Sequence, residues 1–512
     1  RNEGFLASHE ISYGLRQRPE WATADEKSRQ LIGREGRRLI EGLGFDLQRL
    51  DNMTSVLMSD DRKSAVAVLL QENEAVESRS GRFSAMSPIA YALSVADREN
   101  LPYVLVEQRG RVRLYPTRVG VGVGRRGRAE TFIECHTRLL RDSDAAYLWL
   151  LFSGEALAPG GTLEQALEES TRYAGHLAGQ LRQRIYDRVV PRLAGGVAAA
   201  LERDTAPDKG QLDEIYQAAM LLLFRCLFIA YAEDRNLLPY QWNGLYRKHS
   251  LKAMAQELLE IRRREGAFGD DPDIWHDLKR VFRAVDKGKP EWGVPEYNGG
   301  LFSSNPEISS VGALLEDVEL SDRVLGPALS DLLLVDGDEE GPVDFRSLGV
   351  REFGTVYEGL LESELSIADV DLTLDKKGGY LPAQKGAGVV VRAGEVYLHN
   401  KSGVRKSTGS FFTPPFAVQH LLDDAVTPSL RRHFERLDAL DDDAAAAAFF
   451  DFRVADISVG SGHFIVAAVD HLEQAMADYL SRRPLPGVDR ELATLRQAAH
   501  DSLGDLAPHI EL

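Results

Sequence analysis

The sequence predicts a multidomain α/β protein with three segments, 1–153, 154–370 and 371–512. Strand-like apolar runs gather in the first segment, helical periodicity dominates the second, and a strand-to-helix pattern appears in the third. The chain has 512 residues, of which 44% are hydrophobic and 27% are charged. That length suffices for two to four separately cored domains. We therefore expect an α/β domain, an all-helical domain and the beginning of a second α/β domain.

The first segment is predicted to hold one helix and three strands. Leu and Ile residues two turns apart on one face predict a helix from about Glu26 to Ile40. Strand-like runs follow at Ser64 to Leu70, Tyr103 to Glu107 and Arg111 to Tyr115. Only Gln-Arg-Gly separates the last two runs, so we predict a tight hairpin there.

The middle of the chain has helical period almost throughout. It runs from Thr162 to about Val285, and the stretch from Leu221 to Tyr231 is apolar on all sides, which predicts a buried helix. A second, acidic helical stretch is expected to reach Leu365. The Gly- and Lys-rich residues Asp371 to Ser410 are interpreted as a partly extended linker.

Cysteine usage and hydropathy indicate a cytoplasmic protein. Cys135 and Cys226 are too few for a disulfide framework or a four-thiolate zinc site, and we predict no metal ligands. The most apolar run, Ala218 to Ala232, is interrupted by Arg225 and is too short to span a bilayer. We expect no membrane association.

Charge is distributed unevenly along the chain. The net charge is -18, but residues 1–150 carry 23 Lys and Arg against 21 Asp and Glu. Nine arginines lie between Arg109 and Arg141, and residues 311–375 hold seventeen acids against three arginines. The arginine cluster fits contact with a phosphate backbone, and it fits an ordinary solvated surface equally simply.

A glycine loop near the C-terminus is the sharpest local signal. Arg453 to Leu472 reads RVADISVGSGHFIVAAVDHL. We predict a strand from Phe452 to Ile457, then a Gly-Ser-Gly turn, then an apolar helix from Phe464. This is the layout of a nucleotide-type ligand site at the carboxyl end of a strand, although tight strand-to-helix turns also use glycine for steric reasons alone.

A second motif precedes the loop. Lys406 to Val418 reads KSTGSFFTPPFAV, with Thr413 predicted to cap a helix from Pro415 to Ala425. Phe-Thr-Pro-Pro followed by Asp-Ile-Ser-Val-Gly-Ser-Gly-His-Phe resembles the paired cofactor motifs of adenine-N6 DNA methyltransferases, in their usual order. The family's loop is typically Asp-Pro-Ala-Cys-Gly-Ser-Gly-x-Phe, and Ile-Ser-Val replaces Pro-Ala-Cys here.

The resemblance implies a Rossmann-like class I methyltransferase domain that binds S-adenosylmethionine. In that family the glycine loop holds the methionine part of the cofactor, and the Thr-Pro segment closes over it. The implied cofactor-binding residues are Phe412, Thr413, Pro414, Asp456, Ser458, Gly460, Ser461, Gly462, His463 and Phe464.

Three upstream segments narrow the resemblance. Leu222 to Pro239, Tyr297 to Ser304 and Phe353 to Leu365 are similar to segments of large phage-defence methyltransferases. These are the BREX (PglX-type), DISARM and single-chain type II restriction-modification enzymes. In them such segments form a helical connector between a nuclease-like domain and the methyltransferase domain. We assign no chemistry to the three segments themselves.

The resemblance raises the question of a nuclease. The family's nuclease carries an acid, then Glu or Asp, any residue and Lys on adjacent strands, where they serve a divalent metal. Here the strand Ser64 to Leu70 is followed by Gln71, Glu72 and Asn73, and the Asp-x-Lys match at Asp61 lies in a turn. We therefore expect a degenerate nuclease-like fold rather than a cutting enzyme.

The catalytic motif of adenine-N6 transfer, Asn or Asp followed by Pro-Pro-Tyr or Pro-Pro-Phe, is absent, so the catalytic residues stay unknown. We expect that the chain stops inside its catalytic domain and transfers no methyl group alone. The leading hypothesis is a site-specific methyltransferase that marks self DNA, with double-stranded DNA and possible defence-system subunits as partners. The alternatives are a bifunctional restriction endonuclease-methyltransferase and a non-catalytic DNA-binding scaffold subunit.

Overall fold

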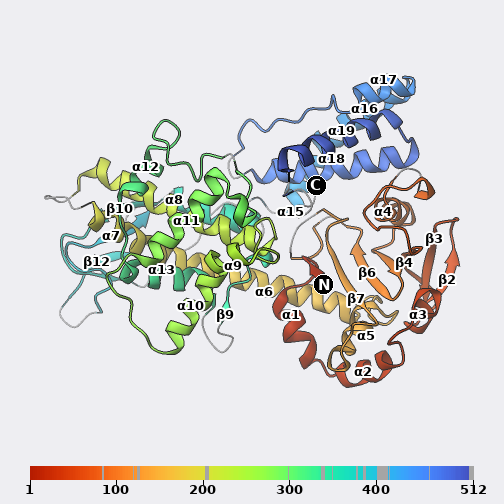
Figure 1. Ribbon diagram of the computed structural model, residues 1–512, viewed down its shortest axis with the longest axis horizontal. Helices are drawn as coiled ribbons and strands as arrows, with labels where there is room; N and C mark the ends of the chain where they lie inside the picture. The colour runs from red at the N-terminus through yellow and green to blue at the C-terminus, as the bar shows by residue number, and fades with distance from the viewer. Residues whose placement is uncertain are drawn as a thin grey trace. The chain divides into compact units, whose positions relative to one another are not determined.

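A computed structural model describes the fold as two compact units. Unit 1 comprises Arg1–Leu177, Ser347–Arg351 and Thr413–Thr494, and unit 2 comprises Ala178–Arg346, Glu352–Phe412 and Leu495–Leu512. Figure 1 shows the chain coloured from end to end. The structure describes residues 1–83, 86–118, 120–123, 127–201, 207–297, 299–335, 341–348, 350–361, 363–375, 379–384, 388–400, 413, 415–459, 462–504 and 506.

A seven-stranded mixed sheet forms the centre of the N-terminal part of unit 1, with the strand order β1-β7-β6-β5-β4-β3-β2. Strands β4 and β5 are parallel and are joined through α4, whereas every other neighbouring pair is antiparallel. The strands are β1 (Asn2–Glu3), β2 (Asp46–Arg49), β3 (Thr54–Ser59), β4 (Arg62–Leu69), β5 (Tyr103–Gln108), β6 (Arg111–Pro116) and β7 (Phe132–His136).

Helices cover both faces of this sheet, because successive side chains of a strand point to opposite sides. Ala65 and Ala67 of β4 join one buried cluster, and Val66 and Val68 join the other. Helix α4 lies on the second face, and α2 and α5 lie on the first (Figure 1). The helices of this part are α1 (Ser8–Ser12), α2 (Trp21–Arg29), α3 (Gly36–Gly42), α4 (Pro88–Glu99), α5 (Ala146–Phe152) and α6 (Thr162–Arg184).

The predicted α/β character and three predicted strands, now β4, β5 and β6, are confirmed. The hairpin is also confirmed: Arg109 and Gly110 form its turn with φ of 53° and 84°, the left-handed values that a two-residue turn requires. The helix predicted from Glu26 to Ile40 is wrong. Gly33 and Gly36 adopt φ of 78° and 58°, so the chain turns between α2 and α3.

Unit 2 is mainly helical, as predicted for Thr162 to Val285, where the described residues contain no strand. A π-helix (Ile185–Val189) joins α6 to α7. The helices are α7 (Val190–Ala200), α8 (Lys209–Asp234), α9 (Gly244–His249), α10 (Leu251–Arg263), α11 (Asp273–Lys287), α12 (Ser310–Asp317), α13 (Asp322–Leu333) and α14 (Val350–Leu361).

Helix α8 is the predicted buried helix. Among the described residues it alone has the length and apolar composition to cross a bilayer, and 61% of its most apolar window is buried inside the protein. Its side chains therefore serve the core of unit 2.

Short strands interrupt the acidic region and the predicted linker. The expectation of helix to Leu365 is wrong, because β8 pairs with β9 and the chain continues from α14 into β10. The described part of Asp371 to Ser410 is not a simple linker, since β13 pairs with β10 and β11 pairs with β12. The strands are β8 (Leu334–Val335), β9 (Gly341–Pro342), β10 (Ser363–Ile367), β11 (Leu372–Leu374), β12 (Tyr380–Pro382) and β13 (Val396–Asn400).

The C-terminal part is helical in all its described secondary structure. The prediction of a helix from Pro415 to Ala425 is confirmed. The helices are α15 (Pro415–Ala425), α16 (Thr427–Asp438), α17 (Asp442–Ala448), α18 (His463–Arg482) and α19 (Pro486–Leu503). The division into domains 1–153, 154–370 and 371–512 stays a prediction.

Candidate functional site

The structure describes six of the ten predicted cofactor-binding residues. Four fall outside the described residues: Phe412, Pro414, Gly460 and Ser461. The six that are described lie before α15 and between α17 and the first turn of α18: Thr413, Asp456, Ser458, Gly462, His463 and Phe464.

The strand predicted from Phe452 to Ile457 is wrong. These residues form no helix or strand, and no described strand pairs with them. Val454 is 36% exposed, Ile457 is fully exposed and Val459 is 50% exposed. An extended segment becomes a strand only when a neighbour accepts its backbone hydrogen bonds, and the described chain supplies none here.

The turn before α18 is organised by its own polar groups. Asp456 Oδ1 accepts a hydrogen bond from the Ser458 amide at 2.9 Å. The Gly462 amide donates to the Val459 carbonyl at 2.8 Å. Gly462 has φ of 80° and is the N-cap of α18, so the predicted glycine-to-helix transition is confirmed. A side chain at this position would be strained although the space around it is open.

Packing between α15 and α18 brings the two predicted motifs into one substructure. Val418 and Leu422 of α15 form a buried cluster with Val426 and with Ala468 of α18, and the partly buried Phe464 packs against this cluster. Phe464 therefore has a packing role in addition to its place in the motif. Thr427 Oγ1 and His471 Nε2 add a hydrogen bond of 2.9 Å beside it.

The loop offers groups suited to a small zwitterion. The first backbone amides of α18, directly after the loop, donate no hydrogen bond to an N-cap side chain. Such amides favour an anionic group. Asp456 is partly exposed and favours a cationic one. The donor set fits the amino-acid end of S-adenosylmethionine. The described residues give no enclosing wall on the side of Ile457, which is fully exposed.

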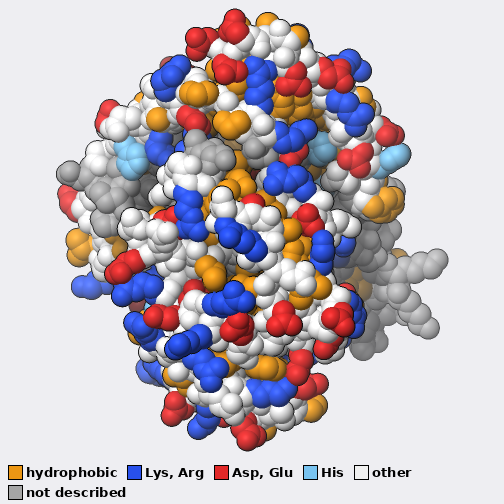
Figure 2. All heavy atoms as spheres, turned by 90° about the vertical axis from the view of Figure 1, so that its right-hand side faces the viewer, with side chains coloured by type: hydrophobic (Ala, Val, Ile, Leu, Met, Phe, Trp, Pro, Cys, Tyr) orange, Lys and Arg blue, Asp and Glu red, His pale blue; other side chains and the backbone are white. Residues whose placement is uncertain are grey.

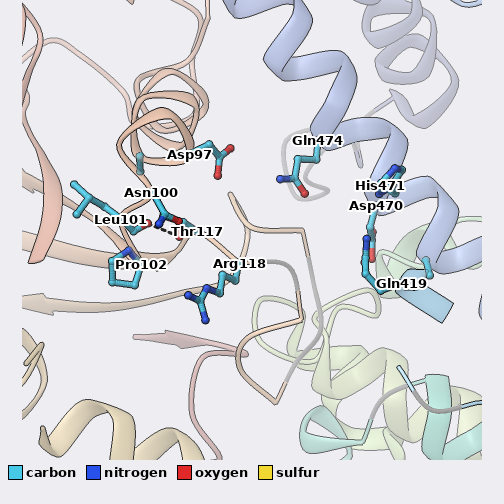
Figure 3. A pocket seen from close by; sticks show the side chains of 12 residues that line it. Asp97, Asn100, Leu101, Pro102, Thr117, Arg118, Gln419, Asp470, His471 and Gln474 are labelled. Atoms are coloured by element: carbon cyan, nitrogen blue, oxygen red, sulfur yellow. Dashed lines mark hydrogen bonds between the residues drawn. The ribbon is translucent and has the colours of Figure 1, made fainter. Parts of the chain in front are cut away.

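A cavity of about 350 Å³ lies elsewhere in unit 1, between the end of α4 and helices α15 and α18. Figure 3 shows Asp97 and Gln474 pointing toward one another across it, whereas the Arg118 guanidinium points away from α18. Sequence reasoning missed these residues, because isolated polar side chains on helix faces give no signal of their own. The residues that line the cavity are Ala96, Asp97, Asn100, Leu101, Pro102, Thr117, Arg118, Gln419, Ala467, Asp470, His471 and Gln474.

The arginine cluster is largely paired with carboxylates. On the face in Figure 2, basic and acidic side chains are interspersed. This favours the solvated-surface interpretation over a phosphate-binding stripe. The described pairs are Arg109 with Glu72, Arg111 with Glu134 at 4.0 Å, Arg113 with Glu77 and Glu134, Arg128 with Asp97 at 2.8 Å, and Arg138 with Glu35 at 2.8 Å.

The two partial matches to a nuclease motif lie at opposite ends of β4. Asp61 is in the turn before the strand, and Glu72 follows its end and pairs with Arg109. Eight residues of strand separate them, and a strand rises roughly 3.3 Å per residue, so the two carboxylates cannot share a metal. The described residues contain no group of three His, Cys, Asp or Glu side chains that could hold a metal ion.

We therefore expect plasmid DNA to stay intact when the protein is incubated with Mg²⁺ or Mn²⁺, because Asp61 and Glu72 cannot share a metal and the described residues hold no group of three possible ligands. Gel electrophoresis of supercoiled plasmid measures nicking and linearisation directly. Metal-dependent cutting that disappears in Asp61→Ala or Glu72→Ala would show that a divergent nuclease site operates here.

The three family-like segments pack together around α8 in unit 2. Arg225 donates to the Leu301 carbonyl at 2.8 Å and to the Ser303 carbonyl at 3.0 Å. Phe353 of α14 packs on Tyr231 of α8 with ring centroids 5.5 Å apart. The three segments thus form one packed cluster around α8. This packing explains their residue types, and no catalytic role is needed.

Comparisons with protein-family models, with curated proteins and with solved structures found no match.

Proposed function

We propose that this chain belongs to a site-specific adenine-N6 DNA methyltransferase that marks self DNA in a bacterial phage-defence system. The observation that carries the proposal is the pair of motifs, Phe-Thr-Pro-Pro and Asp-Ile-Ser-Val-Gly-Ser-Gly-His-Phe, whose helices α15 and α18 pack on one another. Double-stranded DNA is the proposed substrate, other defence-system subunits are possible partners, and the cytoplasm is the proposed location. No catalytic residue is assigned.

In this proposal the described residues bind and orient the cofactor. S-adenosylmethionine supplies an activated methyl group when bound. The amides that follow Gly462 would hold its carboxylate, and Asp456 would face its ammonium group. Thr413, next to the start of α15, would close over the ligand from the other motif. Ser458 keeps the Asp456 carboxylate in place through its amide.

Isothermal calorimetry with S-adenosylmethionine tests the assignment. We expect the 512-residue protein to bind the cofactor and Gly462→Leu to bind it at least tenfold more weakly, because Gly462 has φ of 80° and a side chain there distorts the loop. Gly394→Leu is the matched control, since Gly394 has φ of 86° in open space within unit 2. Its affinity for the cofactor should equal that of the parent protein.

Equal affinity in the parent, Gly462→Leu and Gly394→Leu would contradict the cofactor assignment. DNA binding without any cofactor binding would favour the scaffold alternative. Metal-dependent cutting by the cofactor-binding protein would favour the bifunctional endonuclease-methyltransferase.

A further inference from the structure

Unit 1 contains separate hydrophobic cores in its α/β part and in its C-terminal helices. The two apolar clusters of the α/β part contain no residue after Leu167. The two clusters of the C-terminal helices lie between Val418 and Leu492. These four clusters therefore provide no shared apolar core, which normally makes the largest contribution to holding two parts of a fold together.

Polar groups dominate the contact between the two parts. Helix α18 packs against α4, and the 350 Å³ cavity lies beside this contact. A larger cavity of about 1070 Å³ continues along α16 and shares Asp97, Gln419, His471 and Gln474 with the first. Within the described residues, one ion pair, between Arg79 and Asp489, links the two parts directly. An interface with this much open volume and few direct bonds is easily separated.

Like charges oppose the contact. Asp470 of α18 interacts with Glu130 of the α/β part, and both are negative. Burial of Asp470 and the charge of Glu130 raise the pKa of its carboxyl. The nearby Glu473 keeps an exposed side chain. Partial desolvation raises the pKa of its carboxyl, the cation Arg128 lowers it, and weaker repulsion from Asp470 and Glu130 raises it. Arg128 is already shared with Asp97.

We propose that the C-terminal helices of unit 1, α15 to α18 with the first turns of α19, dock reversibly on the α/β part, held by the Arg79–Asp489 pair and opposed by Glu130, Asp470 and Glu473. Because Gly462 is the N-cap of α18, this docking also sets the position of the glycine loop. The docking itself does not depend on the proposed cofactor. We call this docking equilibrium, which charged side chains control, the latch.

The latch should respond to pH with a definite sign. The docked state raises the pKa of Asp470 and Glu473, so protonation favours docking. Docking is therefore strongest at acidic pH and weakens as pH rises through the raised pKa values. The facing groups are Glu130 and Arg128 from the α/β part, with Asp97 bound to Arg128. Arg118 of the α/β part and His471 of α18 line the same cavity as Asp470.

Energy transfer between two dyes measures the docking. One dye is placed on Gln48→Cys in β2 and the other on Glu491→Cys in α19, both exposed positions. The native Cys135 and Cys226 are buried, and burial raises the pKa of each thiol to about 12, so they compete little for the label. We expect Arg79→Glu and Asp489→Arg each to lower the transfer efficiency, and the double variant to restore it.

Asp470→Asn with Glu473→Gln should raise the efficiency at pH 7 and remove most of its pH dependence. Arg29→Glu is the control, because Arg29 pairs with Asp25 within α2 and should leave the efficiency unchanged. Efficiencies that are identical in all variants, or single-variant effects that merely add in the double variant, would overturn the latch. Calorimetry on Gly462→Leu tests the cofactor separately, so the two proposals can fail independently.

Discussion

Replacing Arg225 by methionine is expected to lower the free energy of unfolding of unit 2 by about 3 kcal/mol. The Arg225 side chain is 2% exposed, and its guanidinium satisfies the Leu301 and Ser303 carbonyls. It also lies 5.4 Å from the Phe282 ring centroid. Methionine keeps much of the volume but leaves two acceptors without their charged donor, and that loss outweighs the relief of removing a buried charge.

Urea unfolding followed by tryptophan fluorescence measures this change. Trp242, Trp275 and Trp292 lie in unit 2, so a Trp21→Phe, Trp149→Phe background makes the signal specific to that unit. Arg280→Met is the matched control, since Arg280 is 57% exposed and pairs with Asp277 on the same helix. Its effect should stay within about 0.5 kcal/mol. Equal urea midpoints for the two variants would mean that Arg225 does not stabilise the packed cluster around α8.

Strands β4, β5 and β6 could be predicted from their continuous apolar runs, whereas β3 was not predicted despite its own short apolar run, and the short polar strands could not be. Residues 64–70 are buried on both faces, so their apolar pattern was unambiguous. Strand β2 is an edge strand with exposed Asp46, Gln48 and Arg49, and nothing in its composition distinguishes it from a loop. Strand β1 has only two residues, which is below the length at which alternation can be seen.

The C-terminal site shows the limit of local reasoning more clearly. The helix start at Gly462 follows from a glycine before an apolar helical pattern, and it is correct. The strand at 452–457 has the right residues but lacks a partner in the described chain, so propensity alone did not create it. The electrostatic repulsion between Asp470 and Glu130 joins residues far apart in sequence, and no local pattern encodes it.

Glu233 is expected to make the stability of unit 2 fall as pH rises. The side chain is fully buried. Its Oε1 accepts from Tyr246 Oη and from the Leu251 amide, each at 2.8 Å, and its Oε2 accepts from the Lys252 amide at 2.9 Å. These bonds connect α8 to α9 and to the first turn of α10, and they favour the ionised form. Burial outweighs them and raises the pKa of Glu233 from 4.5 to about 7.

The sign follows from this raised pKa. The folded state holds its proton up to about pH 7, whereas the unfolded chain releases it near pH 4.5, so stability is fully present below pH 4.5 and is lost as pH rises toward 7. The difference of about 2.5 pKa units corresponds to roughly 3 kcal/mol. We expect Glu233→Gln to lack this part of the pH profile, because a carboxamide does not titrate. Asp234, whose pKa burial also raises, still titrates in this variant.

Urea unfolding at intervals between pH 4 and 8 measures both profiles in the same tryptophan background. Glu260→Gln on α10 is the matched control, because the Glu260 side chain is 53% exposed. We expect this variant to show the same dependence of stability on pH as the parent protein. If the profiles of the parent and Glu233→Gln run parallel, Glu233 is ionised in the folded state throughout this range. The effect of its three hydrogen bonds on the pKa would then outweigh that of burial. The Glu233 carboxylate at the contact between α8 and α10 would stay ionised at every pH in this range.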